Sequence, residues 1–254
     1  MHLYVVTHKK FICPEIEGYI PIQVGKCFTN IDLGFLSDDT KNNIACKNNT
    51  YCELTALYWM WKNDDLKQNE IIGLCHYRRY FTNNLFSKSP KYYLKRHQIE
   101  KELNHFDIIL PKRIYLKSTV GEKYSLTGSG FQKDLEILEG IISERYPEYL
   151  DKYIEIMNSR EQYFWNMFLC KKKIMDDYCK WLFEILEELE RRVDITAYTR
   201  QQARIFGFIA ERLLNVWIGQ KKIRIKEHYV VNSEQKVFDR LKFSIGILIK
   251  KRKI

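Results

Sequence analysis

Short apolar runs of strand length recur along the chain, each followed by polar or basic residues. The run at residues 3–7 leads into His8, Lys9 and Lys10, and the run at 71–75 gives way abruptly to basic and aromatic residues. Short apolar runs bounded by polar residues are typical of buried strands. We predict strands at residues 3–7, 19–25, 71–75, 106–111, 163–170 and 221–231.

Apolar residues at helical spacing occupy much of the sequence between these runs. Residues 172–192 carry the clearest stripe, in which Tyr178, Trp181 and Leu182 are followed by apolar residues at helical spacing up to Leu189. Such a stripe is the pattern of an amphipathic helix with one buried face. We predict helices at residues 54–62, 95–105, 131–157 with a break at Pro147, 172–192 and 202–218.

Polar segments fill the remaining sequence. The longest of them is basic and contains glycine, which is typical of a long loop. Asn49 or Thr50 can cap the helix at 54–62, and Glu53 falls in its first turn. We predict loops at residues 29–49, 82–92 and 112–130.

Strands and helices alternate along the sequence, with no internal repeat and no linker. This alternation indicates an α/β fold, and we assign residues 1–239 to a single domain. In such folds the ligand binds at the carboxyl ends of the strands. The basic residues that follow the strands at 3–7 and 71–75 are therefore the first candidates for a site.

The formal net charge is +10, which favours anionic partners such as phosphorylated ligands, nucleic acid or an anionic membrane surface but does not choose among them. Seven cysteines occur without any Cys-x-x-Cys pair, so we expect free thiols in a reducing cytoplasm, with neither a zinc site nor a disulfide framework. We expect no signal peptide and no membrane span, because the apolar runs are short.

Residues 240–254 form a distinct tail in which basic residues alternate with apolar ones, without an acidic residue. One interpretation is a basic amphipathic segment that lies on the anionic inner face of the cell membrane. The other is a last helix that packs on the body of the protein. The sequence leaves both open.

The strongest chemical signal lies at residues 71–81, where a predicted buried strand is followed directly by His76, Tyr77, Arg78 and Arg79. Adjacent residues on an extended chain point to opposite sides, so we expect one arginine to bind a diphosphate and the other to sit in a structural ion pair. No Asp-x-Asp follows an apolar strand, so a divalent metal (Mn or Mg) is not assigned. Basic residues are the alternative means of neutralising a leaving diphosphate.

Several blocks of sequence together resemble a bacterial family long described as a domain of unknown function in capsular polysaccharide synthesis. The most specific are Tyr-Cys-Glu-Leu-Thr-Ala and Cys-His-Tyr-Arg-Arg-Tyr-Phe. The blocks that carry the resemblance lie at residues 7–9, 21–25, 43–44, 47–48, 51–59, 72–81, 166–168 and 202–214. Members often carry Asp-Thr-Gly-Asp-Asn-Ile in an early loop, but residues 38–44 lack the glycine and the second acid.

The resemblance implies a fold similar to the A-type glycosyltransferases, a twisted mixed sheet flanked by helices. Members of the capsular polysaccharide family have been assigned as glycosyltransferases, and galactofuranosyl transfer is among their activities. It implies a nucleotide-sugar donor and a glycan or lipid-linked glycan acceptor, and no nucleic acid. The donor-binding residues implied are Thr7, His8, Lys9, Lys47, His76, Tyr77, Arg78, Arg79, Asn166 and Arg204.

Two glutamates are candidates for the base that deprotonates the acceptor hydroxyl, if transfer inverts the sugar. Glu53 has the alternative role of a helix cap only. Glu211 has the alternative of a salt bridge with Arg204 or Arg212. The sequence thus predicts a cytoplasmic glycosyltransferase that moves galactose, as pyranose or furanose, from a UDP donor to a capsular, exopolysaccharide or lipopolysaccharide glycan. A non-catalytic membrane-associated scaffold and a nucleic-acid-binding protein are the rival interpretations.

Overall fold

The computed structural model describes residues 1–235, so the tail at 240–254 lies outside it. The strands are β1 (His2–Thr7), β2 (Tyr19–Gln23), β3 (Leu36–Ser37), β4 (Ile71–His76), β5 (Arg79–Thr82), β6 (Ile108–Pro111), β7 (Ile114–Tyr115), β8 (Glu161–Gln162), β9 (Phe168–Lys171) and β10 (Ile225–Asn232). The α-helices are α1 (Asn48–Tyr51), α2 (Leu54–Asn63), α3 (Arg96–Leu103), α4 (Val120–Leu126), α5 (Gln132–Arg145), α6 (Leu150–Asn158), α7 (Lys172–Arg192) and α8 (Ile205–Gln220). Short 3₁₀ turns lie at Lys26–Phe28, Ala45–Lys47, Pro90–Tyr92, Pro147–Tyr149 and Gln202–Arg204.

The main sheet is mixed, as predicted. Within the described residues its order is β3-β2-β1-β4-β5-β10-β6-β9, and β9 also pairs with β4. Strands β3, β2, β1 and β4 run parallel, whereas β9 is antiparallel to β4 and to β6. Because β4 pairs with both β5 and β9, the strands β4, β5, β10, β6 and β9 close into a ring.

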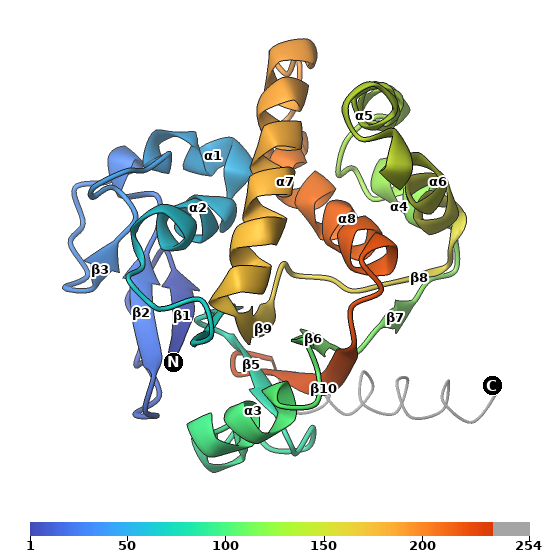
Figure 1. The fold of residues 1–254 in the computed structure, drawn as a ribbon. Helices are drawn as coiled ribbons and strands as arrows, with labels where there is room; N and C mark the ends of the chain where they lie inside the picture. The colour runs from blue at the N-terminus through green and yellow to red at the C-terminus, as the bar shows by residue number, and fades with distance from the viewer. Residues whose placement is uncertain (236–254) are drawn as a thin grey trace.

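Alternating side chains divide the interior into two hydrophobic cores, one on each face of the sheet. In β1, Tyr4 and Val6 belong to the larger core, and Leu3 and Val5 belong to the smaller one. Helices α2, α7 and α8 cover the first face and α3 covers the second (Figure 1). Helix α6 packs against α8, α5 packs against α7, and α4 packs against α5 and α6. The two-residue period of a strand explains this division.

Strand β9 approaches β4 very closely at Gly73. A Cβ atom at this position would lie 2.4 Å from the carbonyl oxygen of Phe168. That is well inside van der Waals contact, so only glycine fits there.

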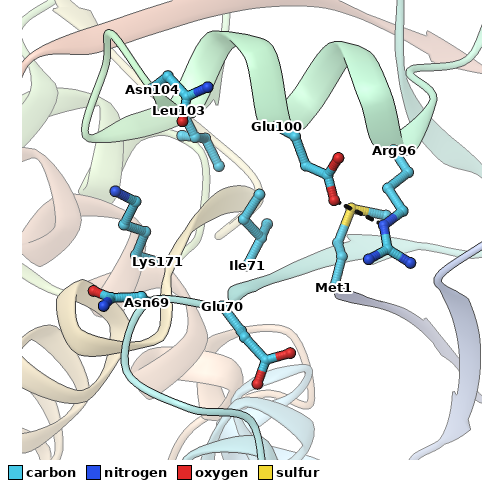
Figure 2. Close-up of a pocket in the computed structure, with 9 residues that line it drawn as sticks. All are labelled: Met1, Asn69, Glu70, Ile71, Arg96, Glu100, Leu103, Asn104 and Lys171. Atoms are coloured by element: carbon cyan, nitrogen blue, oxygen red, sulfur yellow. Dashed lines mark hydrogen bonds and ion pairs between the residues drawn. The ribbon is translucent and has the colours of Figure 1, made fainter.

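A cavity of about 290 Å³ lies at the amino ends of β1 and β4, under α3 (Figure 2). Its lining mixes charges of both signs, among them Glu70, Lys171 and the ion pair of Arg96 with Glu100 at 2.7 Å. Because ligands of parallel sheets bind at the carboxyl ends of the strands, this cavity is at the opposite edge from the expected site.

Two segments differ from the sequence prediction in their secondary structure. Residues 112–130 are not one long loop, because β7 and α4 form within them. Thr119 and Glu122 make a capping box, in which the Glu122 amide donates to the Thr119 hydroxyl at 3.2 Å and the Thr119 amide to the Glu122 carboxylate at 2.9 Å. The strand predicted at 163–170 is shorter, since only β9 is extended and the residues before it turn.

Two further local predictions were wrong. Neither Asn49 nor Thr50 caps α2, because both lie inside α1, and the N-cap residue of α2 is Glu53 without a side-chain cap. The basic segment after β4 is not an extended chain, as assumed for Arg78 and Arg79, because it forms a tight hairpin into β5, closed by the pairing of His76 with Arg79.

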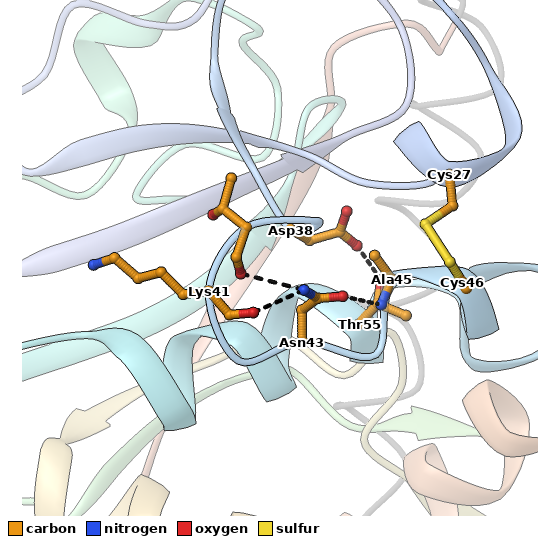
Figure 3. Close-up of a disulfide and its surroundings, with 8 residues drawn as sticks. Cys27, Asp38, Lys41, Asn43, Ala45, Cys46 and Thr55 are labelled. Carbon is orange, nitrogen blue, oxygen red and sulfur yellow. Dashed lines mark hydrogen bonds between the residues drawn. A yellow bond between two sulfur atoms is a disulfide. The ribbon is translucent and has the colours of Figure 1, made fainter.

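The expectation of seven free thiols was also wrong. Cys27 and Cys46 form a disulfide with their Cα atoms 5.3 Å apart (Figure 3). It joins two short turns of a loop whose Asp38 accepts a hydrogen bond from Thr55 of α2 at 2.5 Å. In the same loop Lys41 has a φ of 50°, in the left-handed region that favours glycine.

Candidate active site

The loops that follow β1 and β4 emerge side by side at the carboxyl edge of the sheet. Val6 is paired with His76, and the amide of Tyr77 donates to the carbonyl of Val6 at 3.0 Å. The hydroxyl of Thr7 is buried and accepts from the amide of Lys9 at 3.1 Å, which turns the chain directly after β1. This pairing places residues 7–9 beside residues 76–79.

Three cationic or titratable side chains surround the ring of Tyr77. The His8 ring meets it edge-on at 5.5 Å, the Lys9 ammonium lies 4.9 Å from its centre, and the Arg78 guanidinium 5.6 Å. Burial lowers the pKa of His8, and the charges of Lys9 and Arg78 lower it further. We call these four residues the Tyr77 cluster. It is a positively charged group at the mouth of the parallel strands.

A second group is built on a turn of unusual backbone geometry. Trp165 and Asn166 have φ values of 77° and 50°. Positive φ is uncommon outside glycine, and for a residue as large as tryptophan it indicates strain of about 1–3 kcal/mol. Backbone strain of this kind persists only where surrounding contacts fix it, and it concentrates at functional sites.

Side chains from three other elements fix this turn. The Nε2 atom of His76 lies 2.7 Å from the carbonyl oxygen of Trp165, and the Trp165 amide donates to the Glu211 carboxylate at 2.8 Å. The Asn166 amide group donates to Glu53 at 2.8 Å and to the carbonyl of Gly207 at 3.1 Å. Glu53 and Glu211 are thereby held on either side of the same turn.

The two carboxylates differ in their electrostatic environment. The pKa of Glu211 is raised to about 7, mainly by burial; the charge of Arg212 lowers it and the charge of Glu53 raises it. A carboxyl group with a pKa near neutrality suits general acid–base catalysis. Glu211 therefore has the properties of a proton acceptor.

Arg79 lies beside Trp165 and interacts electrostatically with both carboxylates and with Arg78 of the Tyr77 cluster. Its guanidinium is 5.5 Å from the centre of the Trp165 ring, and no carboxylate in residues 1–235 comes within ion-pair distance of it. Burial lowers its pKa, as does the charge of Arg78, while Glu53 and Glu211 oppose this shift. Arginine remains charged in proteins, so a half-buried guanidinium that has no carboxylate partner among the described residues is suited to bind an anion.

Arg204 interacts electrostatically with His8 of the Tyr77 cluster and with the carboxylates Glu53 and Glu211. Its Nε atom donates to the sulfur of Cys52 at 3.2 Å, and its guanidinium lies 5.4 Å from the ring of Phe208. Its charge lowers the pKa of His8, and the charges of Glu53 and Glu211 raise its own pKa. The sequence-predicted residues that gather here are Thr7, His8, Lys9, Glu53, His76, Tyr77, Arg78, Arg79, Asn166, Arg204 and Glu211.

Lys47 is not brought into this arrangement. Its ammonium pairs with Glu190 of α7 at 2.6 Å and lies over the ring of Tyr51. Asn166 is present but only 3% exposed, and its amide group is used in the bonds to Glu53 and Gly207. Its observed contacts are those of a residue that positions the turn.

Sequence reasoning missed three residues of the site. The backbone of Trp165 contacts His76 and Glu211, and its ring lies against Arg79. No neighbouring residue in the sequence indicates its positive φ. Cys52 contacts Arg204 and lies in the Tyr-Cys-Glu-Leu-Thr-Ala block, which was a usable signal. Glu234 pairs with Lys9 at 2.8 Å and approaches Arg78 at 3.7 Å, and it follows the last predicted strand.

Residues 1–235 contain neither a candidate metal site nor a helix that could cross a membrane. Within residues 1–235, no group of three or more His, Cys, Asp or Glu side chains is arranged to hold a metal ion. Each helix in the same range is too short or too polar to cross a membrane.

A mixed sheet with helices on both faces and a charged cluster at the carboxyl edge of its parallel strands is typical of α/β proteins that bind their ligands at that edge. The chain belongs to the family described as "Domain of unknown function (DUF4422)", which matches residues 2–222. A comparison with curated proteins finds no match.

The fold is also that of a solved glycosyltransferase structure. The chain is similar to the apo structure of the bifunctional glycosyltransferase WbbM, with a TM-score of 0.85 and 30% sequence identity. The similarity covers 92% of this chain and 45% of that one, so this chain spans about half the length of that protein. The predicted fold, a mixed sheet flanked by helices similar to a glycosyltransferase, is confirmed.

Proposed function

We propose that this chain is a glycosyltransferase that moves a sugar from a nucleoside diphosphate donor to a hydroxyl group of a glycan. The observation that carries the proposal is the position of Arg79, which has no carboxylate partner within residues 1–235, beside the turn that holds Glu53 and Glu211. A nucleotide-sugar enzyme needs cations for the diphosphate and a base for the acceptor at one place. The likeness to a bifunctional glycosyltransferase supports the same conclusion.

In this proposal the cationic residues of the site bind the diphosphate, and the carboxylates act on the acceptor. Lys9, Arg78 and Arg79 face the diphosphate, whose negative charge grows as the bond to the sugar breaks. Burial strengthens this stabilisation at half-buried Arg79, because the local dielectric there is lower than that of water. The nucleoside lies toward Thr7 and His8, at the end of β1.

Glu211 is the base in this proposal. As the acceptor oxygen forms its bond to the anomeric carbon, its proton passes to the Glu211 carboxylate, and the bond from that carbon to the diphosphate oxygen breaks. Electrons of the broken bond leave with the diphosphate. The amide of Trp165 holds one carboxylate oxygen at 2.8 Å, which orients the group before reaction. Glu53, fixed by Asn166, is the alternative base.

The donor and acceptor follow from the family resemblance. We propose UDP-galactose, in pyranose or furanose form, as the donor and a capsular, exopolysaccharide or lipopolysaccharide glycan as the acceptor. A divalent metal remains open to test, since cations from the chain and a metal bound with the donor can share the neutralisation of the diphosphate.

A thermal-shift screen tests the proposal first. Purified protein is heated with UDP, GDP, CMP or dTDP, each with and without manganese, because a ligand of the native state raises the melting temperature. Stabilisation by UDP supports the proposed donor, and a shift only with manganese adds a metal to the site. No shift with any of them contradicts the proposal and favours the non-catalytic scaffold.

A further inference from the structure

Glu234 lies against the two cations of the Tyr77 cluster. Its carboxylate pairs with the Lys9 ammonium at 2.8 Å and lies 3.7 Å from the Arg78 guanidinium. One carboxylate oxygen faces each cation, since Oε1 meets Lys9 and Oε2 meets Arg78. Glu234 is thus a bridging anion between a residue after β1 and a residue after β4.

The turn that carries Glu234 is fixed to the hairpin of the site. The amide of Ser233 donates to the carbonyl of Arg78 at 2.9 Å, and the amide of Glu234 donates to the Asn232 side chain at 3.0 Å. Asn232 itself pairs with Arg79 in the sheet. The position of the carboxylate therefore follows from backbone contacts as well as from its charge.

The ion pairs themselves are weak. The side chains of Lys9, Arg78 and Glu234 are 48%, 40% and 44% exposed. Exposed ion pairs contribute little to stability, because water and salt screen them. An anion of higher charge that offers more oxygen atoms can replace such a carboxylate.

We propose that Glu234 is an internal counter-ion that occupies the place of the donor diphosphate and that donor binding displaces it from Lys9 and Arg78. This inference rests on the proposed function, because it assumes that these two cations bind the diphosphate. Once displaced, the carboxylate loses both ion pairs, and donor binding must offset that loss. Glu234 therefore lowers the affinity for the donor and holds the cations in position while the site is empty.

The test compares the affinity of the full chain and of Glu234→Gln for inorganic pyrophosphate, UDP and uridine by titration calorimetry. We expect Glu234→Gln to bind pyrophosphate and UDP about two- to fivefold more tightly, the range that one exposed ion pair is worth. Uridine, which has no diphosphate, is expected to bind both proteins equally. Glu144→Gln is the matched control, since Glu144 makes an exposed ion pair with Arg192 in a different part of the fold.

A double substitution shows whether the effect runs through the two cations. In a Lys9→Met, Arg78→Gln background, adding Glu234→Gln should no longer change the affinity for pyrophosphate. If the gain persists there, Glu234 acts by another route and the proposal fails. It also fails if Glu234→Gln alone binds pyrophosphate as weakly as the wild type or more weakly.

The result separates this inference from the proposed function. If the wild type binds UDP and Glu234→Gln does not alter the affinity, only the counter-ion role is wrong. If neither protein binds pyrophosphate or UDP under any condition tested, the assignment of the diphosphate site falls, and the counter-ion role falls with it.

Discussion

The backbone amide of Trp165 donates a hydrogen bond of 2.8 Å to the carboxylate of Glu211. The donor belongs to a residue with a φ of 77°, so a strained turn and a titrating carboxyl are directly connected. The strained turn keeps the amide pointed at the carboxylate, and the carboxylate in turn helps to hold the turn. Substitutions on either side should therefore affect both catalysis and local order.

Replacing Glu211 with glutamine should abolish most of the transfer activity. A positioned general base contributes about 10²–10⁴-fold to the rate, so kcat should fall by that factor while the affinity for UDP changes little. Steady-state transfer assays and UDP titration measure the two effects. Glu53→Gln distinguishes the alternative base: a larger loss there than in Glu211→Gln would assign the role to Glu53.

Activity should depend on pH through the same carboxyl. The pKa of Glu211 is raised to about 7, so at pH 6 this carboxyl group is protonated in most molecules and cannot accept a proton. We expect kcat to rise with pH through about 7 and then to level off. A profile that is flat from pH 5.5 to 8.5 would contradict Glu211 as the base.

Stability should change with pH in the opposite direction. The folded protein holds the proton on Glu211 more tightly than the unfolded chain does, since burial raises the pKa from its ordinary value of 4.5. This contribution is present below about pH 4.5 and is lost as the pH rises through about 7. Glu211→Gln should therefore be more stable than the wild type at pH 8, by about 3 kcal/mol, and lose that advantage near pH 4.5. Urea unfolding at both pH values measures the difference.

Arg79 should bind the donor without contributing much to folding. Arg79→Lys loses the two-pronged geometry with phosphate oxygens, and we expect the affinity for UDP to fall about tenfold while the melting temperature changes little. Titration calorimetry and thermal unfolding give the two quantities. Arg224→Lys serves as control, because Arg224 pairs with Asp107 on the surface. A large drop in melting temperature for Arg79→Lys would mean that its role is structural.

The disulfide between Cys27 and Cys46 should stabilise the fold measurably. A cross-link that closes a loop of 19 residues restricts the unfolded chain and is worth about 3 kcal/mol. We expect dithiothreitol to lower the urea midpoint of the wild type. The variant Cys27→Ser should start at the lower midpoint and not respond to dithiothreitol, and equal midpoints in all conditions would show that the bond does not form in solution.

Much of the fold could be predicted from the sequence because strong local patterns mark it. The stripe of residues 172–192 corresponds to α7, and the apolar runs at residues 3–7 and 71–75 correspond to β1 and β4. The missed helix α4 also had a local signal, since Thr119 and Glu122 have the spacing of a capping box. The basic, glycine-bearing composition of residues 112–130 is typical of a loop and masks this signal.

The rest could not be predicted because it depends on contacts between distant residues. The positive φ of Trp165 is fixed by His76 and Glu211, which are 89 and 46 residues away in sequence. The pairing of Cys27 with Cys46 follows from the folding of a loop, and the spacing of cysteines does not reveal it. For the site, the edge of the sheet was predictable, but whether Lys47 reaches it or pairs with Glu190 was not.

The ring of strands β4, β5, β10, β6 and β9 has a consequence for synthesis of the protein on the ribosome. Its last member, β10, lies between β5 and β6, which are made more than 100 residues earlier. Until residues 225–232 emerge, β5 and β6 each present an unpaired edge, and such edges bind other strands readily. The nascent chain therefore cannot complete its sheet until β10 has emerged.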